Sequence, residues 1–304
     1  MLNPSTPLNA TTNSMVGTRN KKEQVPVQKI SGLFYVRNFI SHEESQQLLS
    51  HMDHGNGSVN TNHRSTNKND TLLTSIGQSE CMETPSPWKT EIMSRRTQQF
   101  GYHFNYFTGE LKKIEKSNSL EMNSLGIPLY LQSLVERVQQ EHARLNLVNV
   151  SQIHDSCISQ IILNEYCGPY QYIKKHADSL HFGPIISIVS ILQPCVMILY
   201  EVSQDGLPNQ NITSDHHSGA KLDLSVPIKD LKPTGNRSSI VLEPNSLLIL
   251  SGLARYRWKH EIISLKDYEK HGFSLKEVIG TDSNEESYRR VSITMRSVVS
   301  HLEK

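Results

Sequence analysis

This 304-residue sequence has few cysteines, no long apolar run and almost no excess of either charge. The four cysteines form no Cys-x-x-Cys pair and are too sparse for a disulfide framework, so free thiols in a reducing compartment are expected. No segment approaches the ~18 uninterrupted apolar residues of a membrane-spanning helix, and the N-terminal residues contain no signal-peptide-like apolar run. We therefore expect a soluble intracellular protein, cytoplasmic, nuclear or both, with no membrane association.

The sequence lacks the large excess of positive charge that is typical of many nucleic-acid-binding proteins. The 31 Lys+Arg residues face 30 Asp+Glu, which gives a net charge of +1. No global electrostatic attraction to nucleic acid follows from this balance, although a local basic groove remains compatible with it.

Hydrophobic patterning divides the chain into a tail, a helical part and a β-rich part. Residues 1–28 contain few hydrophobic residues and are predicted to be a disordered tail. A short strand at 33–36 precedes a helix at 42–52, which begins with a Ser-x-x-Glu capping box at Ser41 and Glu44. After a predicted loop at 53–70, a second helix is expected over 128–145, with Pro128 in its first turn.

Short β-branched runs then recur between Gly, Pro, Asn and Asp. This pattern predicts an antiparallel β-sandwich or barrel. A long polar stretch at 203–238 is predicted to be an insertion between two strands. The predicted strands lie at 158–166, 185–192, 196–200, 239–242, 246–250 and 291–299.

A histidine and an aspartate two positions apart, His176 and Asp178, suggest a metal site. If this segment is extended, both side chains point to one face. A non-haem ferrous site needs a second histidine besides such a pair. His260, which follows the 246–250 strand, is the favoured candidate over His181, His216, His217 and His271. As an isolated pair, His-x-Asp is more often a surface loop or a structural hydrogen bond.

The last predicted strand alternates polar and apolar residues from Arg290 to Arg296. Its period of two puts Arg290, Ser292, Thr294 and Arg296 on one face and apolar residues on the other. Arginine binds carboxylates with two parallel hydrogen bonds, so this row suits a small anionic ligand. Asn164 and Tyr166 share a face of their own strand in the same way. The alternative for the arginines is a solvated edge strand.

A third pattern mixes arginines with aromatic residues between Arg95 and Tyr106. Arginines interleaved with aromatic rings can hold phosphates and stack bases. Arg95, Arg96 and Tyr102 are therefore candidate substrate-binding residues, and the alternative is a hydrophobic strand with exposed charges beside it.

In combination, these motifs resemble the AlkB family of Fe(II)- and 2-oxoglutarate-dependent dioxygenases. The order is Asn-x-Tyr, Gly, His-x-Asp, a distal His, then two arginines separated by five residues. Segments 39–44, 242–250 and 290–296 look most like the homologue 6 type. Segments 95–102 and 255–260 look more like the homologue 8 type, the transfer-RNA wobble-uridine hydroxylase. Glu261 stands where the family usually has Gly.

The resemblance implies a fold that is mainly β with flanking helices, built on a double-stranded β-helix (jelly roll). It implies Fe(II) bound by His176, Asp178 and His260, with 2-oxoglutarate and O2 as co-substrates. Arg290 would pair with the distal carboxylate of 2-oxoglutarate, assisted by Tyr166, while Arg296 and Asn164 would lie nearer the metal. Residues 80–110 would form part of a nucleotide-recognition lid. The local sequence Gly168-Pro169 predicts a turn, at which we expect the strand pairing to reverse or to form a bulge.

The expected function is hydroxylation or oxidative demethylation of alkylated or modified bases in nucleic acid, RNA rather than DNA, with release of succinate and CO2. A nucleic-acid substrate and a monomeric protein are expected. One catalytic domain would span 29–304, with N-terminal helices and the lid in 29–150 and the jelly roll in 151–304. The alternatives are the same chemistry on a protein or lipid, and a jelly-roll binding protein without catalysis.

Overall fold

A computed structural model describes seven parts of the chain: residues 29–54, 88–92, 94–114, 121–147, 157–209, 226–281 and 284–299. The predicted tail at 1–28 and most of the predicted loop at 53–70 lie outside the described residues, as do Cys81, His216 and His217. The first two residues of that predicted loop belong instead to a helix. Cys157, Cys167 and Cys195 are free thiols, as predicted.

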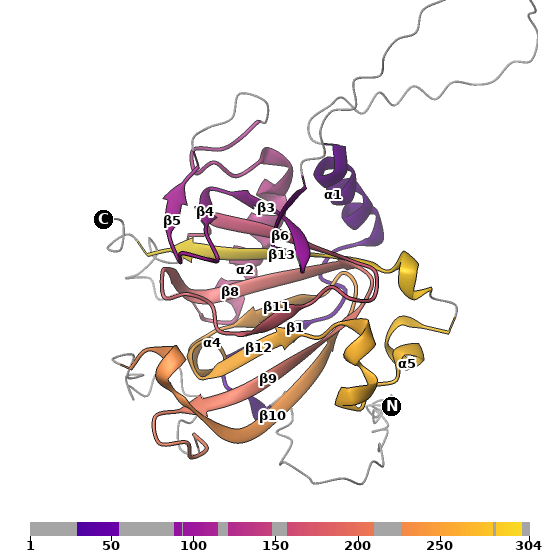
Figure 1. The fold of residues 1–304 in the computed structure, drawn as a ribbon. Coiled ribbons are helices and arrows are strands. Elements are labelled where there is room, and N and C mark those ends of the chain that lie inside the picture. The colour runs from indigo at the N-terminus through magenta and orange to yellow at the C-terminus, as the bar shows by residue number, and fades with distance from the viewer. Residues whose placement is uncertain are drawn as a thin grey trace, which may run out of the picture.

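Eight consecutive strands, β6 to β13, form two antiparallel sheets (Figure 1). The larger sheet contains the order β11-β8-β13-β6, and the smaller sheet has the order β10-β9-β12-β7. This crossing of the chain between two four-stranded layers is a jelly roll and confirms the predicted fold class. The bounds are β6 Gln160–Cys167, β7 Ile173–His176, β8 Phe182–Leu192, β9 Cys195–Ser203, β10 Lys232–Leu242, β11 Leu247–Leu250, β12 Trp258–Ile262 and β13 Arg289–Val298.

The segment before the jelly roll extends the larger sheet at both edges. Strand β1 (Leu33–Val36) pairs with β11, whereas β3 (Arg95–Phe100) pairs with β6 and carries β2 (Lys89–Ile92) at its far side. A separate hairpin is formed by β4 (Tyr102–Phe104) and β5 (Leu111–Lys113). The sequence patterns predicted β1 and offered a strand between Arg95 and Tyr106 as one alternative. They did not predict β2 and β5, because these strands are short and rich in polar residues.

Both predicted helices are confirmed. Helix α1 spans His42–His54, and the Ser41 Oγ accepts a hydrogen bond from the Glu44 amide at 3.1 Å, as a capping box requires. A 3-10 turn, η2 (Leu129–Leu131), leads into α2 (Gln132–Arg144). The remaining helical elements are η4 (Ile228–Asp230), α4 (Gly252–Tyr256), η5 (Leu265–Asp267), η6 (Glu269–His271), α5 (Leu275–Ile279) and η7 (Glu285–Ser287). None of the described helices is long and apolar enough to cross a membrane.

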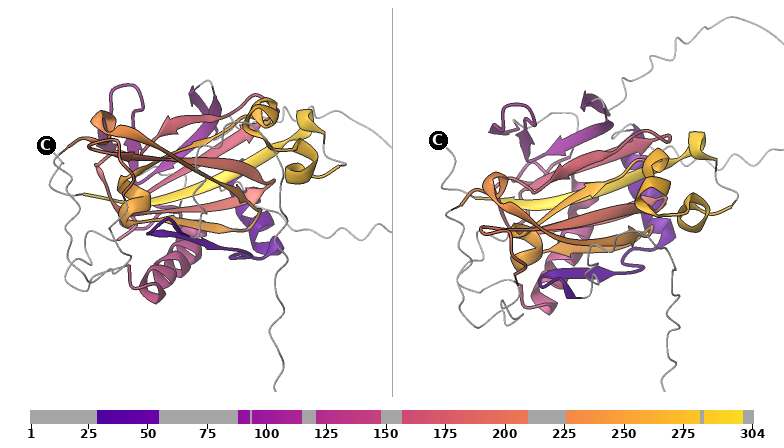
Figure 2. Two further views of the ribbon diagram at one scale, coloured as in Figure 1. Left: turned by 90° about the horizontal axis from the view of Figure 1, so that it is seen from below. Right: turned by 60° about the horizontal axis from the view of Figure 1, so that its bottom comes forward.

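Helices α1 and α2 cover the face of the larger sheet that is turned away from the smaller sheet (Figure 2). Val291, Ile293 and Met295 of β13 pack into this layer with apolar residues of both helices. Because successive strand residues alternate, the polar row of β13 faces the smaller sheet. Arg290 and Arg296 are buried on a central strand, so the alternative of a solvated edge strand is wrong.

The predicted insertion at 203–238 is too long. Strand β10 begins at Lys232 and pairs with β9 across a register shift between Pro233 and Arg237. Residues 232–238 lack the apolar alternation of a strand, and backbone pairing with β9 rather than side-chain burial makes them extended. The Gly168-Pro169 turn is where the chain leaves β6 in the larger sheet for β7 in the smaller one, and Gly168 has a φ of 69°.

His142 of α2 should make the stability of the protein depend on pH. It is buried, its Nε2 lies 2.7 Å from Ser187 Oγ, and its Nδ1 has no hydrogen-bond partner among the described residues. Burial lowers the pKa of His142 from 6.5 to about 4. The unfolded chain therefore binds the proton first, and the free energy of unfolding should fall by up to ~3 kcal/mol as pH drops from about 6.5 towards 4.

Urea unfolding at several pH values would measure this effect. His142→Gln cannot take up a proton, so its stability should decline less than that of the wild type over the same pH range. Parallel pH profiles for the two proteins would contradict the assignment.

Candidate metal and co-substrate site

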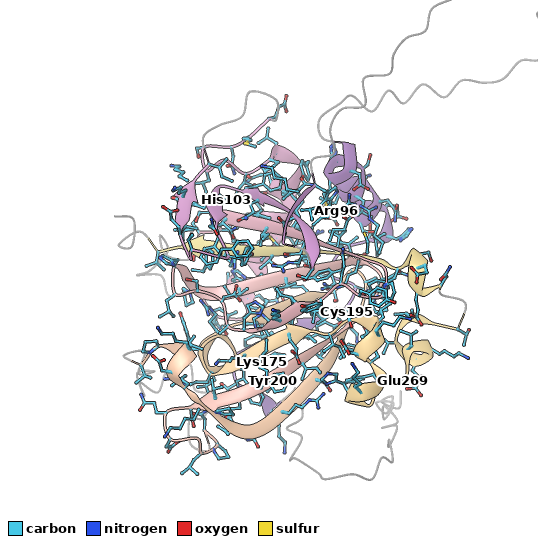
Figure 3. All side chains as sticks on the ribbon, in the orientation of Figure 1. Arg96, His103, Lys175, Cys195, Tyr200 and Glu269 are labelled. Carbon is cyan, nitrogen blue, oxygen red and sulfur yellow. The ribbon has the colours of Figure 1, made fainter. Side chains whose placement is uncertain are left out.

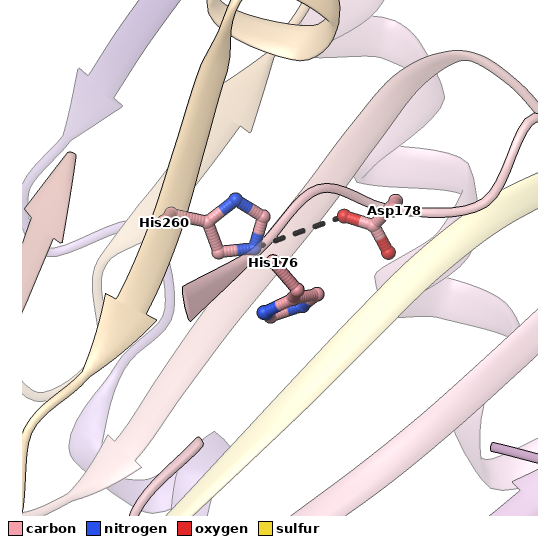
Figure 4. A group of neighbouring side chains, drawn as sticks. All are labelled: His176, Asp178 and His260. Atoms are coloured by element: carbon pink, nitrogen blue, oxygen red, sulfur yellow. Dashed lines mark ion pairs between the residues drawn. The ribbon is translucent and has the colours of Figure 1, made fainter. Parts of the chain in front are cut away.

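Three side chains predicted to form a metal site, His176, Asp178 and His260, lie together between the two sheets (Figure 4). One potential ligand atom from each lies within 4.8 Å of the others. His260 Nε2 is 3.8 Å from Asp178 Oδ2, and the two imidazole centroids are 4.4 Å apart. Two imidazoles and one carboxylate at this spacing form the ligand set of a facial triad.

Strand register explains why these residues meet. Strand β12 lies between β9 and β7, and the antiparallel pairing puts His260 directly opposite His176. Directly opposed residues on one face of such a pair have their Cβ atoms about 5 Å apart. Asp178 lies two residues beyond His176, just after β7 ends. Its carboxylate therefore lies on the same side of the chain as the His176 imidazole.

Hydrogen bonding and burial keep the two histidines in the form that binds metals. His176 Nδ1 lies 2.8 Å from the Lys174 carbonyl, which can only accept, so Nδ1 carries the proton and Nε2 is left for a metal. Burial lowers the pKa of His176. Burial, and next His176, lower the pKa of His260 to about 3. Both imidazoles are therefore neutral at pH 7.

Two arginines hold Asp178. Arg296 Nη1 donates to Asp178 Oδ1 at 2.6 Å, and Arg296 Nε donates to Gln160 at 2.9 Å. Arg255 of α4 donates to the backbone carbonyls of Asp178 at 2.9 Å and Ser179 at 2.7 Å. Burial alone would raise the pKa of Asp178, but Arg296, His260 and Arg255 lower it below its ordinary value. The carboxylate is thus ionised and fixed in position.

Arg290 is a buried cation without a carboxylate partner among the described residues. Its Nη2 donates to Ser190 Oγ at 3.0 Å, and its guanidinium lies 5.2 Å from the centre of the Tyr166 ring. Its Nε and Nη1 are buried and have no hydrogen-bond partner in the part of the chain that the structure describes. A buried, half-satisfied guanidinium is costly unless an anion completes its hydrogen bonds.

These groups line one cavity of about 520 Å³. Asn164 and Tyr166 of β6 share its wall with the polar row of β13, because Tyr166 lies opposite Arg290 and Asn164 opposite Ser292. Asn164 Oδ1 accepts a hydrogen bond from Arg95 Nε at 2.7 Å. All residues predicted to bind the metal or 2-oxoglutarate line this cavity: Asn164, Tyr166, His176, Asp178, His260, Arg290, Ser292, Thr294 and Arg296.

The three candidate substrate residues are not together. Arg95 lines the cavity, and its guanidinium lies 5.3 Å from the centre of the Tyr106 ring. Arg96 points to the other face of β3, where it forms an ion pair with the fully buried Glu165 (Figure 3). Tyr102 begins β4 and does not line the cavity. The consecutive positions of Arg95 and Arg96 on a strand separate them, since neighbours alternate between faces.

The competing histidines with described positions lie elsewhere. His181 Nδ1 is 2.8 Å from Ser179 Oγ, and His271 Nδ1 is 3.0 Å from Arg237 Nη2. Glu261, which stands where Gly was expected, accepts a hydrogen bond from Tyr200 on the outer side of the smaller sheet. The Lys175 ammonium lies 3.8 Å from the centre of that tyrosine ring (Figure 3).

Sequence patterns did not identify several residues that support the site. Ser190 and Gln160 hold the two arginines of β13, and Lys174 lines the cavity from the strand that carries His176. Arg255 belongs to the 255–260 segment of the family resemblance, which assigns it no role. The strand register brings Ser190 opposite Ser292, and no local pattern in the sequence signals that pairing.

The residues fit both groups that the family resemblance implies. Two neutral imidazoles and an ionised carboxylate suit Fe(II). The two unpartnered nitrogens of Arg290 suit a carboxylate bound by two parallel hydrogen bonds. His176, Asp178 and His260 could therefore hold the metal, and Arg290 could hold the distal carboxylate of 2-oxoglutarate.

The chain belongs to the 2OG-Fe(II) oxygenase superfamily, whose family model matches residues 32–296. This match confirms the predicted enzyme class, a 2-oxoglutarate-dependent dioxygenase, together with Fe(II), 2-oxoglutarate and O2. The AlkB-like character predicted from the motif order is confirmed as well.

The sequence is 26% identical over 287 residues to a protein from Arabidopsis thaliana named alkylated DNA repair protein ALKBH8 homolog. That alignment covers 90% of this chain and 60% of the Arabidopsis protein, so this chain spans well under two thirds of that relative's length. Similar solved structures include OsALKBH1, with a TM-score of 0.40 and 11% identity over 88% of this chain and 98% of that one. Another is a prolyl hydroxylase of Trichoplax adhaerens in complex with a peptide fragment, with a TM-score of 0.40 and 13% identity over 89% and 85%.

Replacing Arg290 should separate ligand affinity from stability. In Arg290→Gln, the affinity for 2-oxoglutarate should fall roughly tenfold to a hundredfold, because hydrogen bonds to a charged group are lost. The ligand-free variant should melt no lower than the wild type, since a costly buried charge is removed. Thermal melting of the Mn(II)-loaded protein over a 2-oxoglutarate titration measures both quantities.

Arg289 is the matched control. It is adjacent in sequence but faces away, pairing with Asp53 at 2.6 Å and Glu165 at 2.8 Å. Arg289→Gln should therefore lower the melting temperature and leave 2-oxoglutarate affinity unchanged. Equal loss of affinity in both variants would contradict the role of Arg290.

Proposed function

We propose that this chain is an Fe(II)- and 2-oxoglutarate-dependent dioxygenase that hydroxylates or oxidatively demethylates alkylated or modified bases in nucleic acid. The observation that carries the proposal is that one cavity is lined both by the candidate metal and 2-oxoglutarate residues and by aromatic residues suited to a base. This cavity joins the His176, Asp178 and His260 cluster and the polar row of β13 to Arg95 and the aromatic residues of the β4–β5 hairpin.

When bound, Fe(II) with 2-oxoglutarate and O2 supplies oxidation of a substrate C–H bond to C–OH, with release of succinate and CO2. The residues of the chain provide binding and orientation. His176, with Nδ1 fixed by the Lys174 carbonyl, presents Nε2, while Arg296 and Arg255 keep Asp178 ionised and in place. Arg290 holds the distal carboxylate. An N-methyl group hydroxylated here would leave as formaldehyde, restoring the base.

The open side of the cavity supports a nucleobase as the substrate. Phe104, Tyr106 and Phe107 belong to the hairpin β4–β5 and its turn, and all three line the cavity. Phe107 is 82% exposed and Tyr106 is 38% exposed, so both rings are accessible to a ligand at the cavity. Exposed aromatic rings at a cavity that also contains an arginine are well suited to stacking an unpaired base. These three aromatic residues lie within residues 80–110, the segment predicted to form part of a nucleotide-recognition lid.

Two further observations support nucleic acid as the substrate, and the second of them favours RNA over DNA. The Arabidopsis relative is named for the repair of alkylated DNA. Segments 95–102 and 255–260 resemble the homologue type that hydroxylates a wobble uridine in transfer RNA. The first segment contains Arg95, which lines the cavity, and the second contains Arg255, which donates a hydrogen bond to the Asp178 carbonyl.

Succinate formation should test the proposal directly. The pure protein, titrated anaerobically with Fe(II) and 2-oxoglutarate, should develop the weak visible charge-transfer band of the ternary complex. With O2 and alkylated RNA or DNA oligonucleotides, succinate release should exceed that of His176→Ala by at least about a hundredfold, because the variant lacks one metal ligand.

Peptides and lipids serve as the comparison substrates. Stimulation of succinate release by alkylated oligonucleotides, and not by unmodified ones, supports the proposal. Stimulation by peptides or lipids alone would indicate the same chemistry on another substrate. A folded protein that binds 2-oxoglutarate without turnover of any substrate would instead be a binding protein.

A further inference from the structure

The charges that line the cavity are strongly unbalanced. Four described basic residues line it, whereas Asp178 is the only described carboxylate in its wall. Asp178 already accepts a hydrogen bond from Arg296. The four basic residues are Arg95, Lys174, Arg290 and Arg296.

The cofactor and co-substrate do not remove this excess. Fe(II) adds two positive charges and 2-oxoglutarate two negative ones, so these two ligands cancel. Asp178 then offsets only one of Arg290 and Arg296. One uncompensated positive charge is thus left from Arg290 and Arg296, and Arg95 and Lys174 add two more. No carboxylate of the described wall faces Arg95 or Lys174.

Arg95 is the residue best placed to contact a substrate. It lies on β3, which extends the larger sheet beyond β6 on the side of the β4–β5 hairpin (Figure 1). Its Nε is bound to Asn164, and the Tyr106 ring covers its guanidinium. The side chain is only 3% exposed, and its remaining polar contact is a long one of 3.5 Å from Nη1 to Ser94 Oγ. The guanidinium is therefore rigid and still has N–H groups to donate.

Lys174 adds a second positive charge from the opposite layer. It belongs to β7, two residues before His176, so the two side chains lie on the same face of the strand. Lys174 lines the cavity and is exposed, with no ion pair to any described residue. Arg95 and Lys174 thus place positive charge on both sheets around the position that a substrate would take.

We propose that this cavity selects a base without positive charge that presents a carbonyl oxygen to Arg95, and that it rejects cationic alkylated bases. The inference rests on the proposed function and adds the chemical class of base. Arg95 is the specificity-determining residue, and Lys174 strengthens its effect.

Electrostatics and hydrogen bonding act in the same direction. A cationic base brought within several ångströms of two unpaired cations is repelled, and the low dielectric of a cavity strengthens this repulsion. An amino group in place of a carbonyl would also leave the N–H groups of Arg95 without an acceptor. A site built to hydrogen-bond a group discriminates strongly against an analogue that lacks it.

Two N3-methylated pyrimidines test the proposal. The methyl group of 3-methyluracil lies beside a 4-oxo group on a neutral ring, whereas that of 3-methylcytosine lies beside a 4-amino group on a cationic ring. Placed in the same RNA sequence, the uracil should be demethylated with a kcat/KM at least about tenfold higher. N6-methyladenine against 1-methyladenine, neutral against cationic, is the second pair, and it tests charge alone because neither base presents a carbonyl oxygen.

Charge reversal should invert or abolish this preference. The readout is the ratio of kcat/KM for the two bases within each variant. Loss of the Arg95–Asn164 hydrogen bond could lower the activity on both bases, and such a general loss cancels in the ratio. Arg95→Glu should lower the ratio at least about tenfold, and Arg95→Gln less. Lys174→Glu, at an exposed position without contact to Asn164, should shift the ratio in the same direction with an unchanged melting temperature.

The outcomes separate this inference from the function it rests on. A wild-type preference for 3-methylcytosine and 1-methyladenine, or ratios unchanged by both reversals, would overturn the selectivity and leave the dioxygenase function intact. If the wild type demethylates none of the four bases faster than His176→Ala does, the proposed nucleic-acid demethylation is contradicted, and this inference fails with it.

Discussion

The hydrogen bond between Arg296 and Asp178 connects the parts of this molecule that its chemistry requires. Arg296 belongs to the central strand of the larger sheet, and Asp178 follows an edge strand of the smaller one. At 2.6 Å, between two buried charged groups, this bond ties the two layers together where the three candidate metal ligands converge. Charge-assisted bonds of this kind are short and strong, and breaking one leaves an uncompensated buried charge. The position of the carboxylate therefore depends on the correct packing of both sheets.

Arg255 complements this arrangement from the same chain segment that leads to the third ligand. Helix α4 lies directly before β12, so the residue that binds the carbonyls after β7 precedes His260 by only five positions. The turn that carries Asp178 and the strand that carries His260 are thus held by one short piece of structure. A shift of either element would disturb all three ligands together, which favours a single geometry.

The same cavity contains unsatisfied groups that stability alone does not explain. The two buried nitrogens of Arg290 lack partners, and the lining is rich in positive charge. Native proteins pair almost all buried polar groups, so an unsatisfied guanidinium in the wall of a cavity calls for an explanation, and ligand binding is one. A buried guanidinium with unsatisfied N–H groups costs stability in the ligand-free fold, and a carboxylate ligand would complete its hydrogen bonds.

Several features were predictable because they depend on local pattern. The alternation in β13 identified one buried polar face and one core face, and Ser41 and Glu44 located the start of α1. The strands that present His176 and His260 were not predicted, since β7 and β12 are short and rich in charged residues. Hydrogen bonding to neighbouring strands keeps them extended, and no local hydrophobic pattern signals such pairing.

The sequence by itself determined the ligand types and their order, from Asn164 and Tyr166 through His176 and Asp178 to Arg296, and it indicated the superfamily. Only the tertiary structure decided which histidine completes the cluster, because His260 reaches His176 through strand register and the competitors with described positions do not. Tertiary structure also separated Arg95 from Arg96, sending one into the cavity and the other to Glu165. Both outcomes arise from pairing between strands far apart in the chain, which local sequence does not encode.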